Sequence, residues 1–357
     1  MTPEPLPPGA RIGVLGGGQL GRMLALAAAR LGLRTHVYDP AADPCAAPVV
    51  ERHVRAGWDD EAALAAFAAS VAVVTYEFEN VPLAAAEAVA AVAPLRPGLR
   101  ALAVAQDRVA EKRFLAGLGL AVAPWATVDG AADLDAALAR TGTPAILKTR
   151  RLGYDGKGQA LVARAEDAPA ALAAIGGASS ILEGRVAFAR ELSVIAARGL
   201  DGAIAAYDPG ENRHEQGVLR ETRVPAAVSG ARAAEACAVA AAILEALDYV
   251  GVIGVELFDA QGPLIVNEIA PRVHNSGHWT IDACLIDQFE QHVRAVAGWS
   301  LGDGARHSNA VMQNLLGDQV AAASVIRGAA VHVYDKGEAR PGRKMGHVTR
   351  IAPRSGD

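Results

Sequence analysis

Cysteine is scarce in this chain, which has only Cys45, Cys237 and Cys284 among 357 residues and no CxxC spacing. Disulfide scaffolds and structural zinc clusters need paired or closely spaced cysteines, so the sequence argues against both and favours a reducing compartment. No uncharged run is long enough to span a bilayer, and the proline-rich start, which carries Glu4, does not resemble a signal peptide. We therefore expect a cytoplasmic protein without a membrane partner.

A strong charge of one sign is also absent, because 34 basic and 39 acidic residues leave a net charge of −5. This balance gives no reason to expect nucleic acid as the main partner. Aromatic residues make up only 4% of the chain, and the excess of Ala over them favours many close-packed helices. A length of 357 residues exceeds the usual size of one compact core and predicts two or three domains.

The first hundred residues alternate between strand and helix patterns. We predict strands over 11–15, 35–38 and 71–76 and a helix over about 22–31, hence a doubly wound parallel sheet in a domain covering residues 1–105. Ligands of such sheets bind beyond the carboxyl ends of the strands. The turn from Gly16 to Gly21 reads GGGQLG and, with Asp39 about twenty residues on, also fits a dinucleotide fingerprint, so a nicotinamide or flavin role stays open.

A second glycine-rich loop occupies residues 152–158, just after a predicted strand that carries Lys148. The order strand, glycine loop, strand, helix, strand over about 144–190 predicts a small α+β lid, grouped with a leading helix from Gln106 in a domain over 106–190. Backbone N–H groups in such a loop can close over polyphosphate, and lysines supply point charges to its oxygens. A dehydrogenase would not need this loop, and GxxxxGK[ST] is absent. A plain hairpin with a glycine-rich tip is the alternative.

A third feature lies in the remaining domain, residues 191–357. The β-rich runs 252–258 and 264–269 flank a turn and predict a hairpin, in which Glu256 lies directly opposite Glu268 if the turn centres near Gly262. Like charges at opposed positions destabilise a sheet, so we expect a cation between them. With Asn267 as a further oxygen ligand, the site suits Mg²⁺ or Mn²⁺ held together with substrate phosphates. Two solvated surface glutamates are the alternative.

Four segments carry a resemblance to a known family: residues 16–23 (GGGQLGRM), 75–81 (TYEFENV), 153–159 (GYDGKGQ) and 267–278 (NEIAPRVHNSGH). With Lys148 and Glu256 they resemble the ATP-grasp superfamily and, within it, the 5-(carboxyamino)imidazole ribonucleotide synthases of purine biosynthesis. The resemblance covers the chain and implies an α/β ATP-grasp fold. It also implies ATP, bicarbonate and 5-aminoimidazole ribonucleotide as substrates, carboxyphosphate as the first product, and a homodimer. Val273 stands where many relatives have proline.

The resemblance also implies which residues surround ATP. They are Arg108, Lys148, Gly153, Tyr154, Asp155, Gly156, Lys157, Gly158, Gln159, Glu183, Val186, Glu191, His214, Asn267 and Glu268, and Lys157 is placed with the catalytic residues as well. Phosphoryl transfer to bicarbonate needs positioning and charge neutralisation rather than a protein nucleophile. A closing lid would protect carboxyphosphate from water.

The ribotide is expected against a second set of residues, which shares Tyr154 and Asp155 with the first: Gln19, Leu20, Glu77, Tyr154, Asp155, Arg272, His274, Asn275, Lys336 and Arg343. Arg272 and His274 can hold bicarbonate and assist proton movement on the amine, since histidine titrates in a suitable range. The four-residue spacing of His274 and His278 also allows a zinc pair, although the residues between them form a poor helix. Lys336 and Arg343 would clamp the 5′-phosphate; a solvated basic tail is the alternative.

Two other functions remain open at this point. A formate-dependent glycinamide ribonucleotide transformylase would share the fold, ATP and metal yet activate formate. A nicotinamide-dependent oxidoreductase, from a different class, would show bound cofactor absorbance and tight NAD binding.

Overall fold

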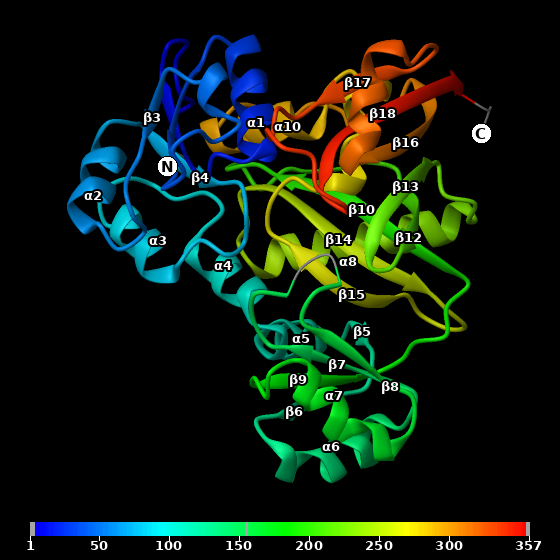
Figure 1. The fold of residues 1–357 in the computed structure, drawn as a ribbon. Helices are drawn as coiled ribbons and strands as arrows, with labels where there is room; N and C mark the ends of the chain where they lie inside the picture. Colours follow the sequence, from blue (N-terminus) through cyan, green and yellow to red (C-terminus); the bar gives the residue numbers. More distant parts are fainter. Residues whose placement is uncertain (1–3, 154–155, 355–357) are drawn as a thin grey trace.

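The structure is a computed structural model that describes residues 4–153 and 156–354. Figure 1 shows the N-terminal part of the chain beside the C-terminal strands, which form one end of a long central sheet, with a small separate layer of strands and helices at the bottom. Among the described residues, no helix combines the length and the apolar composition needed to cross a membrane.

The N-terminal region is built on a four-stranded parallel sheet, as predicted. Its strands lie in the order β3 (Arg52–Val54), β2 (Arg34–Tyr38), β1 (Arg11–Leu15) and β4 (Val73–Tyr76). Helix α1 (Gln19–Arg30) packs on one face, whereas α2 (Glu61–Ala69), α3 (Leu83–Ala90) and α4 (Leu99–Gln106) share a core with the other. Helix α1 begins about three residues earlier than predicted, because a carboxylate accepts hydrogen bonds from the amides of its first turn.

The small layer has a core of its own. Its antiparallel strands lie in the order β6 (Trp125–Val128), β9 (Ser180–Gly184), β7 (Ala145–Thr149) and β8 (Gln159–Val162). Helices α6 (Leu134–Thr141) and α7 (Ala168–Ala174) contribute Leu134 and Leu172 to the apolar core that also contains Leu147. The predicted order of strand, glycine loop, strand, helix and strand is confirmed.

The central sheet joins most of the remaining strands. Its order is β17 (Ala330–Val333), β18 (Lys344–Pro353), β16 (Ser308–Leu316), β13 (Val218–Val224), β12 (Gly210–Glu215), β10 (Arg190–Arg198), β14 (Gly251–Asp259), β15 (Ile265–Ala270) and β5 (Ala121–Val122), with β11 (Ile204–Ala206) beside β10. Alternate residues of β10 face opposite layers. Val194 packs in the core that contains α8 (Gly230–Ala246), and Ile195 in the core that contains α10 (Gln288–Ala297).

Helix α5 (Arg108–Gly117) begins where predicted but packs against the central sheet. Its Leu115 lies in the α8-side core, Glu111 accepts a 2.7 Å hydrogen bond from the Ile269 amide, and β5, which follows it, pairs with β15. Domain boundaries at 105/106 and 190/191 therefore remain a proposal, and the packing favours grouping α5 and β5 with the central sheet rather than with the lid.

Candidate active site

A cavity of about 1090 Å³ lies where the N-terminal region, the lid, the central sheet and the β17–β18 connection meet. Most of the residues predicted to bind substrates line it: Gln19, Leu20, Glu77, Arg108, Lys148, Gly153, Gly156, Lys157, Gln159, Glu191, His214, Glu256, Asn267, Glu268, Arg272, His274, Asn275, Lys336 and Arg343. Gly158, Glu183 and Val186 are not among its lining residues, and Tyr154 and Asp155 lie outside the described residues. The fold therefore brings most of the residues predicted from the sequence together around one cavity.

The predicted carboxylate pair is present on the hairpin of β14 and β15. Glu256 is the register partner of Glu268, and the register then shifts by one residue, which leaves Asn267 as the extra residue of a bulge. The Asn267 amide lies 3.5 Å from the Glu256 carboxylate. Burial, reinforced by the charge of Glu268, raises the pKa of Glu256. Such repulsion is what a bound cation would relieve.

Cations converge on the other carboxylate. Arg108 lies 3.1 Å from Glu268, and although burial would raise the pKa of Glu268, the charges of Arg108 and Lys148 outweigh it and lower that pKa. Lys148 is itself anchored by Glu183, at 3.0 Å, beneath the cavity wall. Glu183, which was predicted to surround ATP, is only 4% exposed and so acts here through the lysine that it holds.

The glycine loop connects β7 to β8 beside these lysines and arginines. Its mouth is closed by a hydrogen bond of 2.8 Å from the Thr149 amide to the Gly158 carbonyl. Gly158 has φ +70°, and a Cβ there would lie 2.6 Å from the Thr149 hydroxyl, so only glycine fits. The loop is thus fixed at its base while Gly153, Gly156 and Lys157 face the cavity.

At the opposite wall, His214 on β12 is hydrogen-bonded to Glu191 on β10. Burial alone would lower the pKa of His214, but the bond to Glu191 and the charges of Glu256 and Glu191 raise it. Phe258 lines the same wall and stacks on Phe188 with ring centroids 4.6 Å apart. This wall therefore combines an apolar surface with a polar edge.

The loop after the hairpin carries Arg272, whose guanidinium is held by Glu79 at the end of β4. One of the two hydrogen bonds measures 3.0 Å, and a third donor is 3.1 Å from the Val273 carbonyl. Guanidinium has five N–H donors, so two remain for an anion in the cavity. Glu79 lies in the TYEFENV segment but is not among the predicted site residues, since nothing local in the sequence predicts its pairing with Arg272.

His274 lies in the site, but the pKa expected of it is wrong. Burial, together with the charges of Arg272 and Lys344, lowers the pKa of His274 to about 3, so the imidazole is neutral at pH 7. Its Nδ1 is 2.8 Å from the Ser276 hydroxyl and its Nε2 is 3.6 Å from Glu256. A neutral ring still offers a nitrogen that can accept a hydrogen bond.

The alternative zinc pair does not form among the described residues. His278 is buried with its Nδ1 3.0 Å from the Gln288 side chain, and His274 faces Glu256 instead. The intervening residues form a short 3₁₀ turn, η4 (Asn275–Gly277), rather than the α-helix that would bring both rings to one face.

In the N-terminal glycine turn, protein carboxylates already occupy the amides. Glu77 accepts hydrogen bonds from the Gly18 amide and, at 2.6 Å, from the Gly21 amide, while Asp39 accepts from Gly17 at 2.7 Å. Gly16 has φ +103°, and a Cβ there would lie 2.6 Å from the Glu77 side chain. A dinucleotide pyrophosphate would have to displace both carboxylates, which argues against the fingerprint interpretation.

Four cationic residues from the β17–β18 connection and the start of β18 line the cavity. Lys336 and Arg343 were predicted; Arg340 and Lys344 line the cavity as well. Burial lowers the pKa of Lys336 to about 8, and its ammonium lies 5.7 Å from the Tyr334 ring centroid. The basic segment is therefore part of the site rather than a solvated tail.

Several lining residues were missed: Phe78, Glu79, Asn80, Ile146, Gly217, Val218, Leu219, Phe258, Arg340, Pro341, Gly342 and Lys344. Most of them are sequence neighbours of a predicted residue or lie in one of the four segments that carry the family resemblance. The residues from Gly217 to Leu219, at the turn of the β12–β13 hairpin and the start of β13, carried no such signal. This hairpin is placed at the site by its pairing with the distant strands β10 and β16.

Comparison with known proteins agrees with this geometry. Residues 10–106 match the ribonucleotide synthetase preATP-grasp domain, 113–289 the ATP-grasp domain and 310–357 the phosphoribosylaminoimidazole carboxylase C-terminal domain. The N5-carboxyaminoimidazole ribonucleotide synthase of Brucella melitensis is 52% identical over 361 residues, covering 99% of this chain and 100% of the relative. The chain belongs to the N5-carboxyaminoimidazole ribonucleotide synthase family.

Solved structures of this synthase family share the fold. The N5-carboxyaminoimidazole ribonucleotide synthetase from Thermus thermophilus is 49% identical, with a TM-score of 0.90 over 96% of this chain and 93% of that one. The Aspergillus clavatus synthase, crystallised with ADP and 5-aminoimidazole ribonucleotide, is 32% identical, with a TM-score of 0.91 over 97% and 94%. The ATP-grasp fold predicted from the sequence is confirmed, and the chain is an ATP-grasp ligase.

Proposed function

We propose that this protein carboxylates 5-aminoimidazole ribonucleotide with bicarbonate, at the expense of ATP, to give 5-(carboxyamino)imidazole ribonucleotide, ADP and phosphate in purine biosynthesis. The supporting observation is that one cavity contains a carboxylate pair, a glycine loop with lysine, and a separate four-cation cluster. The first two suit the triphosphate of ATP, and the third suits the phosphate of a second substrate.

We place ATP between the lid and the central sheet. Lys148, Arg108 and Lys157 would neutralise charge on its phosphate oxygens, and the glycine-loop amides would follow the phosphates as the loop closes. Glu191 and His214 would form hydrogen bonds with the polar edge of the nucleoside, beside the apolar surface of Phe258.

The donor set of Glu256, Glu268 and the Asn267 side chain fits a hard divalent cation such as Mg²⁺ or Mn²⁺. It offers only oxygen ligands when the Asn267 side-chain amide is flipped so that its oxygen faces the ion. Such an ion would neutralise phosphate charge that the protein's cations do not reach. It would also relieve the repulsion by Glu268 that adds to burial in raising the pKa of Glu256.

Bicarbonate would lie against the donors of Arg272 that Glu79 leaves available. One bicarbonate oxygen attacks the γ-phosphorus, the bond to ADP breaks, and carboxyphosphate forms. The amine of the ribotide then attacks the carboxyl carbon, phosphate leaves, and the amine loses a proton. The phosphate that leaves is basic enough to take this proton, and neutral His274, whose Nε2 lies 3.6 Å from Glu256, can accept a hydrogen bond from the amine.

The ribotide would bind with its 5′-phosphate against Lys336, Arg340 and Arg343 and its base toward Gln19 and Leu20. Glu77 is 7% exposed and bonded to the glycine turn, so we assign it the positioning of these two residues rather than a direct contact. We also propose a homodimer in the cytoplasm; the three free cysteines agree with a reducing compartment.

The test is ADP release from purified protein. ADP formation should require a divalent cation and bicarbonate and rise strongly with 5-aminoimidazole ribonucleotide, while formate should not replace bicarbonate. Equal turnover with formate and glycinamide ribonucleotide would contradict the proposal.

A further inference from the structure

Two histidines and an aspartate gather outside the cavity, near the chain's C-terminal strands. Asp282 belongs to α9 (Thr280–Ala283), His332 to β17 and His347 to β18. One possible ligand atom from each lies within 4.8 Å of the others, and none of the three residues lines the cavity. None of these three residues has a role in the proposed reaction.

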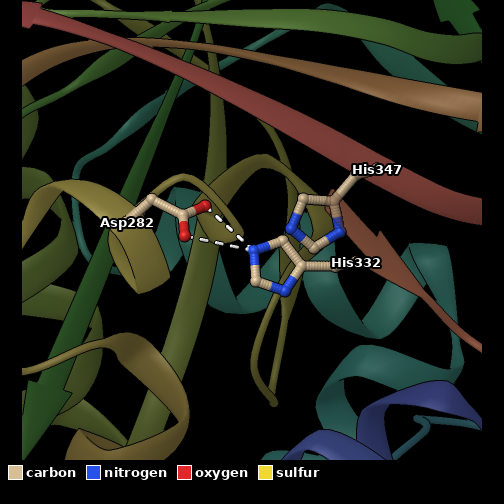
Figure 2. Close-up of side chains that lie close together, drawn as sticks. All are labelled: Asp282, His332 and His347. Atoms are coloured by element: carbon tan, nitrogen blue, oxygen red, sulfur yellow. Dashed lines mark hydrogen bonds and ion pairs between the residues drawn. The ribbon is translucent and has the colours of Figure 1, made fainter. Parts of the chain in front are cut away.

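The contacts within the group leave one nitrogen unexplained. His332 Nε2 lies 3.1 and 3.0 Å from the two Asp282 oxygens, and the rings of His332 and His347 stack with centroids 4.5 Å apart. His347 is completely buried, and its Nε2 has no hydrogen-bond partner among the described residues. Figure 2 shows that this nitrogen is on the side of the ring toward Asp282 and the His332 nitrogen.

An ordinary histidine–aspartate ion pair accounts for only part of this arrangement. It satisfies His332 and Asp282 but leaves the Nε2 of His347 buried without a partner among the described residues, which is energetically unfavourable. Buried ring nitrogens in proteins are usually paired. A ligand that takes electron pairs from both rings and from the carboxylate would satisfy all three residues together.

We propose that Asp282, His332 and His347 bind a Zn²⁺ ion. Two imidazoles and one carboxylate are donors that a borderline divalent metal prefers, and three protein ligands leave a fourth position for water. The hard cations suited to the Glu256–Glu268 pair prefer oxygen ligands, so the two sites differ in chemistry.

The geometry requires the two rings to leave their stack around the ion, because a metal lies in the plane of each imidazole that binds it and the rings are now only 16° from parallel. Ligands about 2.1 Å from a tetrahedral zinc are roughly 3.4 Å apart, so the contact between His332 and Asp282 is already close enough. The remaining separations, all within 4.8 Å, shorten if the His332 ring tilts. That is feasible because His332 lies on an edge strand and its side chain is 27% exposed.

A neighbouring tyrosine fixes the ring that cannot move. The Tyr334 hydroxyl is 2.8 Å from His347 Nδ1, so a proton on Nδ1 can be donated to the hydroxyl oxygen and the lone pair is left on Nε2. Burial also keeps the pKa of His347 well below its ordinary value, so the ring is neutral, as a metal ligand must be.

Such an ion would tie three segments together. It would join α9, which follows the loop with His274, to the two strands whose connection carries Lys336 and Arg343. Its effect would therefore be structural: holding the basic connection against the body of the site. This inference stands whether or not the proposed reaction is correct.

The experiment is a Zn²⁺ titration of metal-free protein by calorimetry, with Mg²⁺ in excess and in a Glu268→Ala background, so that the carboxylate pair does not contribute. One equivalent should bind. His332→Ala and Asp282→Asn should weaken binding by at least about a hundredfold, whereas His307→Ala, an exposed histidine on the same chain region, should match the parent. His347 is left intact, because its removal would open buried space.

Two further readouts separate a site from adventitious binding. Co²⁺ in place of Zn²⁺ should give visible absorption bands of a bound ion in the parent and lose them in His332→Ala. Zn²⁺ should raise the melting temperature of the parent but not of His332→Ala. No saturable binding by the parent, or equal binding by His332→Ala and Asp282→Asn, would overturn the proposal.

Discussion

Arg272 and Glu79 form a largely buried ion pair that joins the loop after the metal hairpin to the end of β4, 193 residues earlier in the chain. The Arg272 and Glu79 side chains keep 17% and 23% of their surface exposed, and both line the cavity. This pair fixes the orientation of the one guanidinium that faces the proposed bicarbonate position. It also couples the N-terminal region to the central sheet.

Glu79→Ala should therefore affect both stability and catalysis. Loss of the charged hydrogen-bond partner of a partly buried guanidinium should lower the unfolding free energy by about 1.5–3 kcal/mol, which urea denaturation measures. The KM for bicarbonate should rise more than the KM for ATP, because the orientation of Arg272 is lost. Glu51→Ala, which removes an exposed ion pair with Arg11, should leave both nearly unchanged. Unaltered bicarbonate KM in Glu79→Ala would show that Arg272 needs no such partner.

Glu268→Ala should lower turnover by orders of magnitude while the protein stays folded. The change leaves Glu256 facing a divalent cation with too few oxygen ligands, and each tenfold loss of rate is about 1.4 kcal/mol of transition-state stabilisation. Steady-state ADP release at ordinary Mg²⁺ measures it, with circular dichroism as the check on folding. Glu245→Ala, at an exposed site on α8, is the matched control. Near-normal ATPase activity in Glu268→Ala would contradict the metal assignment.

The basic cluster should serve the ribotide and not the nucleotide. Arg343→Ala and Lys336→Ala each remove a charge-assisted hydrogen bond worth about 1.5–3 kcal/mol, so the KM for 5-aminoimidazole ribonucleotide should rise about ten- to a hundredfold. ATP affinity without ribotide should stay within about twofold. Arg327→Ala, outside the cavity lining, is the control. Weakened ATP binding with an unchanged ribotide KM would assign the cluster to the nucleotide.

His292 makes stability depend on pH through its burial between two regions. Its Nδ1 accepts from the Val252 amide at 3.1 Å, so its Nε2 carries the proton and donates to the Thr75 hydroxyl at 2.8 Å. Burial lowers the pKa of His292 to about 3, below the unfolded value near 6.5. The unfolded state therefore binds the extra proton, and stability is lost as the pH falls below about 6.5.

The consequence can be measured as a difference in slope. Between pH 7 and pH 5.5 the parent should lose about 1 kcal/mol more unfolding free energy than His292→Gln, in which position 292 carries no titratable side chain. Urea denaturation at the two pH values provides the comparison, and His307→Ala should lose as much as the parent. A His292→Gln variant with the parent's pH dependence would show that this imidazole is not held neutral.

The sequence predicted the parts of the site that depend on local order. The opposition of Glu256 and Glu268 followed from the turn between them, and the glycine loop followed from its own residues. Arg343 and Lys336 were predicted together because they lie in one short basic segment that the family resemblance covers. These features need only neighbouring residues to define them.

Other features depend on pairing and burial that no local pattern records. The pairing of Arg272 with Glu79 and the anchoring of Lys148 by Glu183 arise from segments brought together by the fold. The pKa of His274 could not be predicted, because desolvation by the packed site lowers it, whereas the sequence shows only a histidine in a polar loop. The sequence suggests that the amides of the N-terminal glycine turn are free to bind a phosphate, whereas in the structure Glu77 accepts hydrogen bonds from two of them.

The central claim is that bicarbonate is activated by ATP as carboxyphosphate before its carboxyl group reaches the ribotide. Turnover with bicarbonate labelled with ¹⁸O at all three oxygens, followed by mass analysis of the phosphate formed, tests this directly. Attack of a bicarbonate oxygen on the γ-phosphorus predicts one ¹⁸O atom in each phosphate released, in the presence of ribotide. Phosphate that contains no ¹⁸O while labelled carboxylated product accumulates would contradict the account.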